Sequence, residues 1–375
     1  MTLVVGVPTE TKEDEARVAL TPEGVRELGA HGVPVLLEAG AGAGSSIDDD
    51  AYRRAGAEIV ASAAEVWERA DLVCKVKEPQ PSEFAHLRKG LVLFTYLHLA
   101  AYSEVADALL GHGVTGIAYE TVQLPSGELP LLAPMSEVAG RMSVQVGAHL
   151  LERPHGGRGV LMGGAPGVRP ARVAVLGAGN VGWNAAWMAA GLEAEVDLLD
   201  RNIDRLRLVD QIQMGRITTL ASNRGTVEQV VPAADLVIGA VLIPGGRAPV
   251  VVTEDIVRSM RAGSVVIDIA IDQGGCIETS HETTHTDPVF ERHGVLHYAV
   301  GNMPGAVPHT STYALTNVTL PYLAELARLG VAEAVGRDRP LALGVNTVGG
   351  QVVNPAVAEA LGRAAVPLES ALAEG

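Results

Sequence analysis

The stretch RVAVLGAGNVGWNAAWMAAG, residues 172–191, decides the fold of this chain. Its apolar run VAVL predicts a buried strand, and the alanine-rich run after Gly182 predicts a helix. Between them, Gly177, Gly179 and Gly182 form a G-x-G-x-x-G pattern. Such glycines allow a tight turn, close approach of a phosphate to the backbone, and close packing of the helix on the strand. The stretch therefore predicts a strand–turn–helix unit that binds a dinucleotide, and a glycine turn without a ligand is the alternative.

Asp200 lies where the ribose of such a nucleotide is recognised. It ends the strand-like run EVDLLD (195–200), 18 residues after Gly182. A carboxylate at this place accepts hydrogen bonds from the ribose hydroxyls and repels a 2′-phosphate. The sequence therefore favours NAD over NADP, and Arg201 beside the acid leaves NADP as an alternative.

Short apolar runs alternate with helical stretches along most of the chain, which predicts an α/β fold with parallel sheets. The strand-like runs before residue 130 are LVVGVP (3–8), PVLLEAG (34–40), DLVCKVKEP (71–79), LVLFTYLHLA (91–100) and TGIAYET (115–121). Those after the glycine motif are EVDLLD, ADLVIGAVLIPG (234–245), GSVVIDIAIDQGG (263–275) and VLHYAVGNMPG (295–305). We expect two Rossmann-like domains whose sheets flank a cleft and are linked by long helices.

Two long helical stretches mark the expected domain boundaries. One begins at Ser136 within PLLAPMSEVAGRMSVQVGAHLLERP (130–154), and the other covers 310–330. We expect residues 1–135 to form a substrate-binding, catalytic domain and residues 136–304 to form the NAD-binding domain. Residues 305–375 are expected to return to the first domain, because the tail from 331 lacks a core of its own.

Composition excludes several classes of partner. The formal net charge of the 375 residues is −16, which argues against nucleic acid or an anionic membrane as the main partner. No apolar stretch reaches the roughly 18 residues of a membrane span, and the N-terminus lacks the order of a signal peptide. Cys74 and Cys276 lack metal-ligand spacing, so we expect reduced thiols in a cytoplasmic protein.

Lysine is rare in this chain and is concentrated in one motif. Of 28 cationic side chains only four are lysines, and Lys75 and Lys77 stand two apart in DLVCKVKEP. On a strand they would share one face, with Cys74 and Val76 on the other. Lysine where arginine is the rule indicates a need for a compact ammonium, and a solvated strand edge is the alternative.

His98 interrupts the apolar run LVLFTYLHLA. The run alone favours a core histidine with a satisfied hydrogen bond. Its place near the carboxyl end of a parallel strand, where ligands collect, favours a proton carrier instead. A second histidine pattern, HETTH (281–285), imitates a zinc signature, but the polar, Thr-rich surroundings predict a loop without metal.

Other strand ends supply further candidates by the same rule. Val241 and Leu242 follow one predicted strand, and Asn302 and Met303 follow another. In VVIDIAIDQGG we expect Asp268, in mid-strand, to be a buried structural acid, and Asp272, at the strand exit, to face the ligand.

Motifs along nearly the whole chain resemble those of the bacterial L-alanine dehydrogenase family. They are KVKEP, LFTYLHLA, AYETVQ, LPLLAPMSEVAGR, GGRGVLMGG, GAVLIPG, IDIAIDQGG and NMPGAVPHTSTYALTN, and only the tail after about residue 335 matches less well. The resemblance implies reversible conversion of L-alanine, water and NAD to pyruvate, ammonium and NADH. It also implies a homohexamer without a catalytic metal.

The resemblance assigns roles to particular residues. It implies that Arg17 and Lys77 bind the substrate, that His98 is the acid and base, and that Asp272 is the second catalytic acid. Read together with the glycine motif and the strand ends, it gives a cofactor set of Ser136, Gly177, Gly179, Asn180, Val181, Gly182, Asp200, Arg205, Ser222, Val241, Leu242, Asn302 and Met303. Taken without the resemblance, Arg17 would be a solvated surface charge and Ser136 a helix N-cap.

The chemistry of alanine oxidation needs these residue types. An arginine grips a carboxylate bidentately, a lysine offers a point charge, and an imidazole both gives and takes protons at neutral pH. Asp272 would hold the positive charge of the imine. The methyl group of alanine needs a small apolar pocket, for which we expect Tyr96 and Met135.

Three other functions remain as alternatives. The NAD(H)-binding component of proton-translocating transhydrogenase shares the two-domain plan but performs no chemistry on a small substrate. A dehydrogenase of another amino acid and an NAD-sensing module with a dead site are the other two. Lys77 and His98 argue for an enzyme, because neither nucleotide binding nor sensing needs them.

Overall fold

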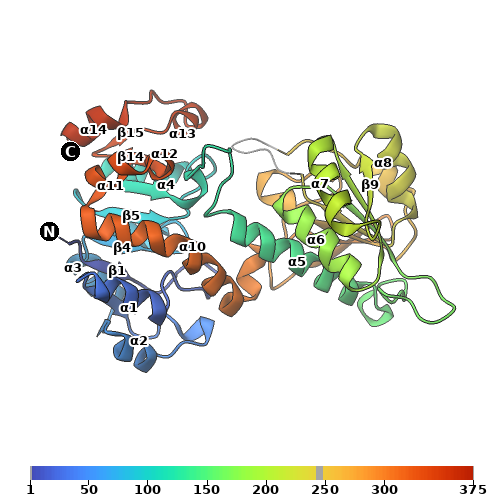
Figure 1. Ribbon diagram of the computed structural model, residues 1–375, viewed down its shortest axis with the longest axis horizontal. Coiled ribbons are helices and arrows are strands. Elements are labelled where there is room, and N and C mark those ends of the chain that lie inside the picture. The colour runs from blue at the N-terminus through green and yellow to red at the C-terminus, as the bar shows by residue number, and fades with distance from the viewer. Residues whose placement is uncertain (1, 242–247, 375) are drawn as a thin grey trace. The chain divides into compact units, whose positions relative to one another are not determined.

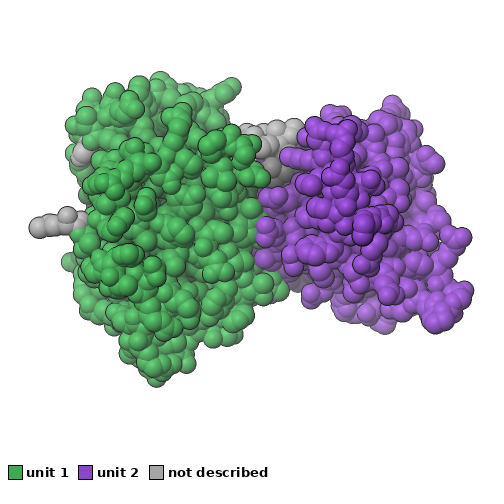
Figure 2. Space-filling model, viewed as in Figure 1, with its two compact units in different colours: residues 1–135, 307–375 green, residues 136–306 purple. Residues whose placement is uncertain are grey.

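Each of the two units into which the chain divides is built on one sheet. The computed structural model describes residues 2–241 and 248–374. Unit 1 comprises residues 1–135 and 307–375, and unit 2 comprises residues 136–306 (Figure 2). Among the described residues, no helix has the length and apolar character needed to cross a membrane.

The sheet of unit 1 has eight strands in the order β15-β14-β6-β5-β4-β1-β2-β3 (Figure 1). The strands are β1 (Val5–Val7), β2 (Val35–Glu38), β3 (Glu58–Val60), β4 (Leu72–Cys74), β5 (Val92–Thr95), β6 (Thr115–Ala118), β14 (Val345–Val348) and β15 (Gln351–Val352). The six from β6 to β3 are parallel, and β14 and β15 add an antiparallel edge. Unit 1 is thus a doubly wound sheet that switches direction between β1 and β4.

Helices connect these strands, and the first of them begins with a side-chain cap. They are α1 (Pro22–Ala30), α2 (Asp49–Ala55), α3 (Ala63–Arg69), α4 (Ser103–Gly111), α10 (Pro308–Leu329), α11 (Val331–Arg337), α12 (Arg339–Gly344), α13 (Pro355–Ala360) and α14 (Leu368–Glu374). The hydroxyl of Thr21 accepts the N–H of Gly24, so α1 begins with the side-chain cap and N1 proline typical of helix starts. The tail contributes to the sheet of unit 1, because β14 pairs with β6.

Unit 2 repeats the same winding around the glycine motif. Its strands are β7 (Arg172–Leu176), β8 (Glu195–Asp200), β9 (Thr218–Ala221), β10 (Leu236–Gly239), β11 (Val265–Asp268), β12 (Val289–Arg292) and β13 (Val295–Tyr298). Their order is β12-β13-β11-β10-β7-β8-β9, parallel except for β12. The helices are α5 (Ala133–Leu150), α6 (Asn180–Gly191), α7 (Ile203–Gln213), α8 (Arg224–Val230) and α9 (Glu254–Arg258). The switch point lies between β7 and β10.

The central strands of unit 2 are apolar throughout because helices cover both faces of the sheet. Val173 and Val175 belong to one core cluster, together with the alanines of α6. Ala174 and Leu176, which point the other way, belong to a second cluster with Val237 and Val257. This two-sided burial explains why these strands read as continuous apolar runs rather than as alternating ones.

Three local predictions are wrong. The strand predicted over DLVCKVKEP ends at Cys74, so Lys75 and Lys77 lie beyond it and do not share a strand face. Asp268 is the last residue of β11 rather than a mid-strand residue. The helix predicted from Ser136 begins at Ala133, so Ser136 lies inside its first turn and is not an N-cap.

Candidate active site

The side chains that follow β1 and β4 meet at the switch point of unit 1. The carboxylate of Glu10 accepts the backbone N–H of Val76 at 2.6 Å and that of Lys77 at 3.4 Å. The ammonium of Lys75 lies 3.1 Å from Oε2 of the same carboxylate. Ligands of doubly wound folds bind at this kind of edge, outside the carboxyl ends of strands where the winding reverses.

Lys75 anchors a buried charge network beneath this edge. Its side chain is fully buried, and its Nζ also lies 3.0 Å from Oε1 of Glu83, which is buried as well. Burial lowers the pKa of Lys75, yet Glu10 and Glu83 outweigh that effect and hold the pKa above its usual value. The alternative of a solvated strand edge is therefore wrong for Lys75. Lys77, two residues on, is half-buried.

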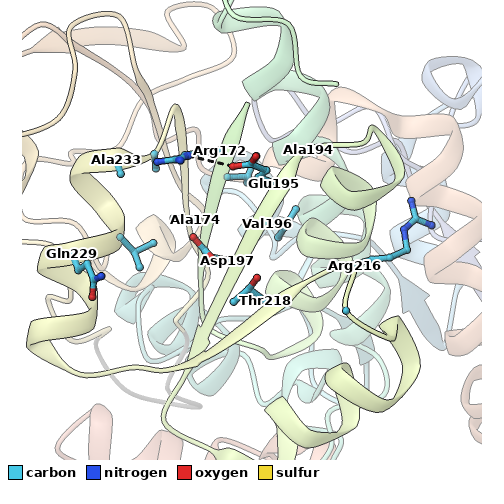
Figure 3. Close-up of a pocket in the computed structure, with 14 residues that line it drawn as sticks. Arg172, Ala174, Ala194, Glu195, Val196, Asp197, Arg216, Thr218, Gln229 and Ala233 are labelled. Carbon is cyan, nitrogen blue, oxygen red and sulfur yellow. Dashed lines mark hydrogen bonds and ion pairs between the residues drawn. The ribbon is translucent and has the colours of Figure 1, made fainter. Parts of the chain in front are cut away.

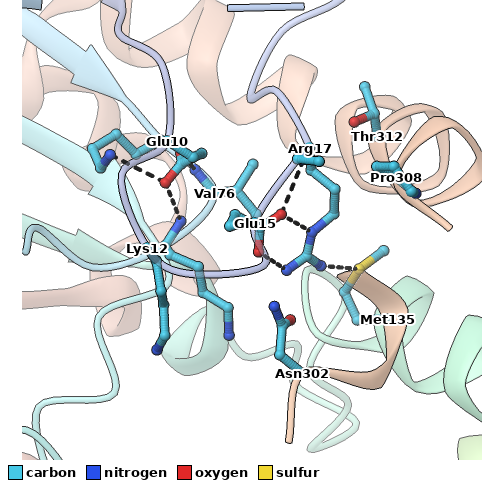
Figure 4. A network of polar contacts seen from close by, with 12 residues as sticks. Glu10, Lys12, Glu15, Arg17, Val76, Met135, Asn302, Pro308 and Thr312 are labelled. Atoms are coloured by element: carbon cyan, nitrogen blue, oxygen red, sulfur yellow. Dashed lines mark hydrogen bonds and ion pairs between the residues drawn. The ribbon is translucent and has the colours of Figure 1, made fainter. Parts of the chain in front are cut away.

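Arg17 is buried rather than solvated, being only 2% exposed. Its Nε donates to Oε1 of Glu15 at 2.7 Å, and its Nη2 donates to the second oxygen of the same carboxylate. Its Nη1 donates to Sδ of Met135 at 3.0 Å (Figure 4). Glu15 thus fixes the plane of the guanidinium, and one edge of that plane faces a thioether, which is a weak acceptor. The surface-charge alternative for Arg17 is wrong.

His98 follows β5 as Lys77 follows β4, each three residues past the end of its strand. The main chain beyond the two strands stays paired, because Tyr96 N–H donates to the carbonyl of Val76 at 3.3 Å. The hydroxyl of Thr95 donates to the carbonyl of Lys77 at 2.9 Å. Since β4 and β5 are parallel neighbours, the side chains of Lys77 and His98 leave the same edge of the sheet.

The surroundings of His98 exclude a core histidine. Its backbone φ is +47°, in the left-handed region, and its side chain is 34% exposed. The backbone N–H donates to Oε1 of Glu120 at 2.6 Å, and Nδ1 lies 3.9 Å from the same oxygen. The ring stacks parallel on Tyr96 with centroids 5.6 Å apart, and the hydroxyl of that tyrosine donates to the carbonyl of Leu131. The imidazole is therefore oriented by neighbours but accessible.

The glycine motif of unit 2 has space for a ligand at one glycine only. Gly177 has φ +106°, and a Cβ there would lie 2.5 Å from the carbonyl oxygen of Ala240. A Cβ on Gly182 would lie 1.7 Å from the carbonyl oxygen of Gly177. Beside Gly179 the nearest atom is Nη1 of Arg205, at 3.7 Å. The first and third glycines are therefore required by packing, and the second faces open space at the start of α6, which has no side-chain cap.

Asp200 has a structural role at this turn. Its carboxylate accepts the N–H of Ala178 at 2.6 Å and that of Asn202 at 2.7 Å. Nη1 of the exposed Arg205 lies 3.9 Å from the same carboxylate. Asp200 thus ties the glycine turn to the end of β8, and its side chain remains 12% exposed.

The remaining residues of the predicted set lie mostly at or beyond strand ends in unit 2. Asp268 is buried and accepts the N–H groups of Cys276 and Ile277 at 3.0 Å, as a structural acid would. Asp272 is exposed on the short helix after β11. Of the other cofactor candidates, Asn180 is exposed and Met303 is buried. The half-buried ones are Ser136, Val181, Ser222, Val241 and Asn302, and Leu242 lies outside the described residues. The segment HETTH is a loop, as predicted.

A cavity of about 480 Å³ lies at the opposite edge of the sheet of unit 2, where β7 and β8 begin (Figure 3). Arg172 and Glu195, the first residues of β7 and β8, border it and pair at 3.2 Å. The glycine turn follows the other end of β7. This cavity is therefore not the nucleotide site.

Several functional neighbours were not predicted from the sequence. They are Glu15 beside Arg17, Glu120 beside His98, and the buried network of Glu10, Lys75 and Glu83. Glu15 could have been found from its closeness to Arg17 in the sequence, and Glu120 from its place in the AYETVQ motif. Nothing in the sequence pairs residue 10 with residue 75.

Comparisons with known proteins agree over the whole length. Residues 6–139 match the family model described as alanine dehydrogenase/PNT, N-terminal domain, and residues 143–355 match its C-terminal domain. The chain is 55% identical to the alanine dehydrogenase of Bacillus subtilis (strain 168), covering 99% of this chain and 98% of the relative. It is 56% identical to that of Mycolicibacterium smegmatis, covering 96% and 97%.

Solved structures give the same relationship. One described as L-alanine dehydrogenase superposes with a TM-score of 0.93 at 51% identity, covering 96% of this chain and 99% of that chain. The transhydrogenase from Sinorhizobium meliloti superposes with a TM-score of 0.82 at 28% identity, covering 93% and 100%. The fold is thus common to both kinds of protein, and sequence identity is far higher to the dehydrogenases.

Proposed function

The chain belongs to the alanine dehydrogenase/PNT family, and on that premise we propose that it catalyses the reversible, NAD-dependent oxidative deamination of L-alanine to pyruvate and ammonium. Its relatives at 53–56% identity over nearly their full length are alanine dehydrogenases. One observation in unit 1 carries the proposal. Arg17 is buried with its guanidinium aligned by Glu15, and it directs a donor at the thioether of Met135.

That donor suits a substrate carboxylate. A thioether is a poor acceptor, so an incoming carboxylate would replace Met135 and gain a charge-assisted hydrogen bond. Lys77 adds a second positive charge from the segment that Glu10 holds by backbone hydrogen bonds. We propose that Arg17 and Lys77 together hold the carboxylate and fix Cα for hydride removal.

Unit 2 fits NAD at its glycine turn. The open side of Gly179 and the uncapped start of α6 suit a pyrophosphate, because backbone N–H groups at a helix start attract negative charge. Asp200, which already orders the turn, has exposed surface left for ribose hydroxyls. NAD supplies the hydride acceptor. We propose that NAD contacts the full predicted set of cofactor residues, in which Arg205 lies beside Gly179.

Proton transfer falls to His98. After hydride removal the imine is attacked by water, which must lose a proton, and the resulting carbinolamine must gain one as ammonia leaves. An imidazole does both at neutral pH. Stacking on Tyr96 and the carboxylate of Glu120 orient the His98 ring for this exchange. We assign Asp272 to the positive charge of the imine and to the orientation of the attacking water.

The broader assignments follow from this reaction. Unit 1 supplies the substrate-binding groups and unit 2 the nucleotide-binding groups, with residues 307–375 belonging to the substrate-binding unit. Both cysteines are free and buried, which suits a reducing compartment, and we propose a cytoplasmic homohexamer.

The test follows NADH absorbance at 340 nm with pyruvate and ammonium. We expect oxidation that His98→Asn reduces by at least about 100-fold, since general acid–base catalysis contributes 10²–10⁴-fold. NADH binding, measured by fluorescence, should be unchanged in this variant. His112→Asn, on the exposed C-cap of α4, is the matched control and should retain full activity. Tight NADH binding without turnover in the unmodified protein would instead favour a transhydrogenase-like or sensing role.

A second assay tests the methyl pocket. We assign it to Tyr96 and Met135, so Met135→Ala should improve turnover of 2-oxobutyrate relative to pyruvate. The assignment is wrong if this ratio stays at the unmodified value while the variant remains active.

A further inference from the structure

Three metal-ligating side chains converge at the end of α5, in unit 2. His149 lies in the last turn of that helix, and Glu152 and His155 follow in the sequence HLLERPH (149–155). Oε2 of Glu152 is 4.0 Å from Nδ1 of His149 and 3.7 Å from Nε2 of His155. One ligand atom from each of the three side chains lies within 4.8 Å of those of the other two. In residues 2–241 and 248–374 no other group of three His, Cys, Asp or Glu side chains meets this spacing.

The three side chains are not satisfied by one another. Both nitrogen–oxygen separations exceed the length of a hydrogen bond. The two imidazole rings approach to a centroid distance of 3.7 Å with their planes tilted by 41°. The carboxylate oxygen and both rings therefore remain available to a shared ligand.

The spacing is close to that of a coordinated cation. Tetrahedral bonds of roughly 2.0–2.1 Å place neighbouring ligand atoms about 3.4 Å apart. The carboxylate–imidazole separations are 3.7 and 4.0 Å, and all three ligand atoms lie within 4.8 Å of one another, so side-chain rotations can bring them to this spacing. Two imidazoles and one carboxylate are ligands typical of zinc, cobalt or nickel, whereas calcium and magnesium prefer oxygen alone.

The backbone already holds the three residues in place. The N–H of Glu152 donates to the carbonyl of His149 at 3.1 Å, and the N–H of His155 donates to the carbonyl of Glu152 at 3.1 Å. Gly156 has φ +92°, and a Cβ on Gly157 would lie 2.2 Å from the carbonyl oxygen of Leu150. The turn is thus fixed by hydrogen bonds and by two glycines, and binding a cation would order side chains only.

The cluster is also accessible. The three side chains are 59%, 58% and 39% exposed, in chain order. Both histidines border a surface cavity of about 500 Å³ that Val289 and Tyr298 line from the other side. A hydrated cation can therefore reach them without opening the fold, and water can complete its coordination.

We propose that His149, Glu152 and His155 bind one divalent cation of the zinc class at the surface of unit 2. The cation ties the last turn of α5 to the glycine turn that follows it, which stabilises unit 2. The site uses none of the residues assigned to substrate or nucleotide, so it is independent of the proposed reaction.

The test titrates zinc chloride into the full, tag-free chain after treatment with EDTA, by isothermal calorimetry. We expect one equivalent per chain whose affinity falls at least tenfold in both His149→Ala and His155→Ala. His31→Ala is the matched control, because the exposed His31, at the C-cap of α1, pairs with a single carboxylate, Glu27, and completes no cluster. This variant should bind zinc like the unmodified chain.

Thermal unfolding gives a second readout. Zinc should raise the unfolding temperature of the unmodified chain and of His31→Ala, but not that of the two cluster variants. All four proteins should unfold at the same temperature in EDTA, which shows that the variants fold. Zinc binding that survives in both cluster variants, or no binding by the unmodified chain, would overturn the proposal.

Discussion

Replacing Lys75 by methionine tests whether the buried network supports unit 1. The ammonium is fully buried and lies 3.1 Å from Glu10 and 3.0 Å from Glu83. Methionine fills a similar volume but leaves two carboxylates buried without a cation. Removing one partner of a buried ion pair costs about 3–5 kcal/mol. Because folded domains are stable by roughly 5–15 kcal/mol, we expect a loss of about a fifth or more of the stability.

The loss should depend on pH with a definite sign. Burial already raises the pKa of Glu10, and Lys75 opposes that rise. Without the cation the folded-state pKa of Glu10 rises further above its unfolded value of 4.5. A carboxyl group whose pKa is raised in the folded state adds to the stability below pH 4.5. That added stability is lost as the pH rises through the folded-state pKa. The deficit of Lys75→Met should therefore be larger at pH 7 than at pH 5.

Urea unfolding followed by the fluorescence of Trp67 measures this deficit. Trp67 is buried in unit 1, and Trp183 and Trp187 of unit 2 are replaced by phenylalanine in every protein compared. Lys89→Met, at an exposed lysine, is the matched control and should change stability by less than about 0.5 kcal/mol. A loss below about 1 kcal/mol at pH 7, or one that does not vary with pH, would refute the reasoning.

Three further predictions concern other buried groups. Burial lowers the pKa of His297 to about 4, so on acidification from pH 6.5 to 4 only the unfolded state gains its proton. The unfolding free energy should therefore fall by about 3 kcal/mol over this range. His297→Gln should flatten that part of the plot of unfolding free energy against pH. Burial raises the pKa of Tyr96 and Tyr119, so above pH 10 each should lower the unfolding free energy by up to about 1.4 kcal/mol per pH unit. The tyrosinate absorbance of these two residues at 295 nm should appear only on unfolding. Gly182→Ala places a Cβ 1.7 Å from a carbonyl oxygen and should weaken NADH binding, measured by fluorescence titration, at least tenfold. Gly191→Ala is the control and should bind NADH normally, because a Cβ at Gly191 would meet no neighbouring atom within 4 Å.

The sequence predicted the central strands of both sheets because those strands are buried on two faces. LVIG of β10, for instance, is buried at every residue and lies within the predicted run ADLVIGAVLIPG. The edge strands were missed. TTLA of β9 is exposed or half-buried along its length and has no apolar pattern. β14 and β15 form because β6 offers a partner more than 200 residues away, which no local pattern records.

In the candidate site too, local features were predicted and long-range contacts were not. The glycine motif is local, and its turn forms as predicted. The burial of Arg17 was unpredictable, because DEARVAL reads as a solvated segment and Met135 lies far along the chain. The strand prediction for Lys75 and Lys77 failed because the Glu10 carboxylate takes the N–H of Val76, so β4 stops at Cys74.

The pairing of β14 with β6 has a consequence for how the protein is made. Val345 pairs with Ile117, so one edge of β6 stays open on the ribosome until more than 200 further residues have been synthesised. Unit 2, residues 136–306, is continuous and is translated in full during that interval. The nascent chain can therefore complete its second sheet before its first, and the exposed edge of β6 is the place where premature release or slow translation would invite aggregation.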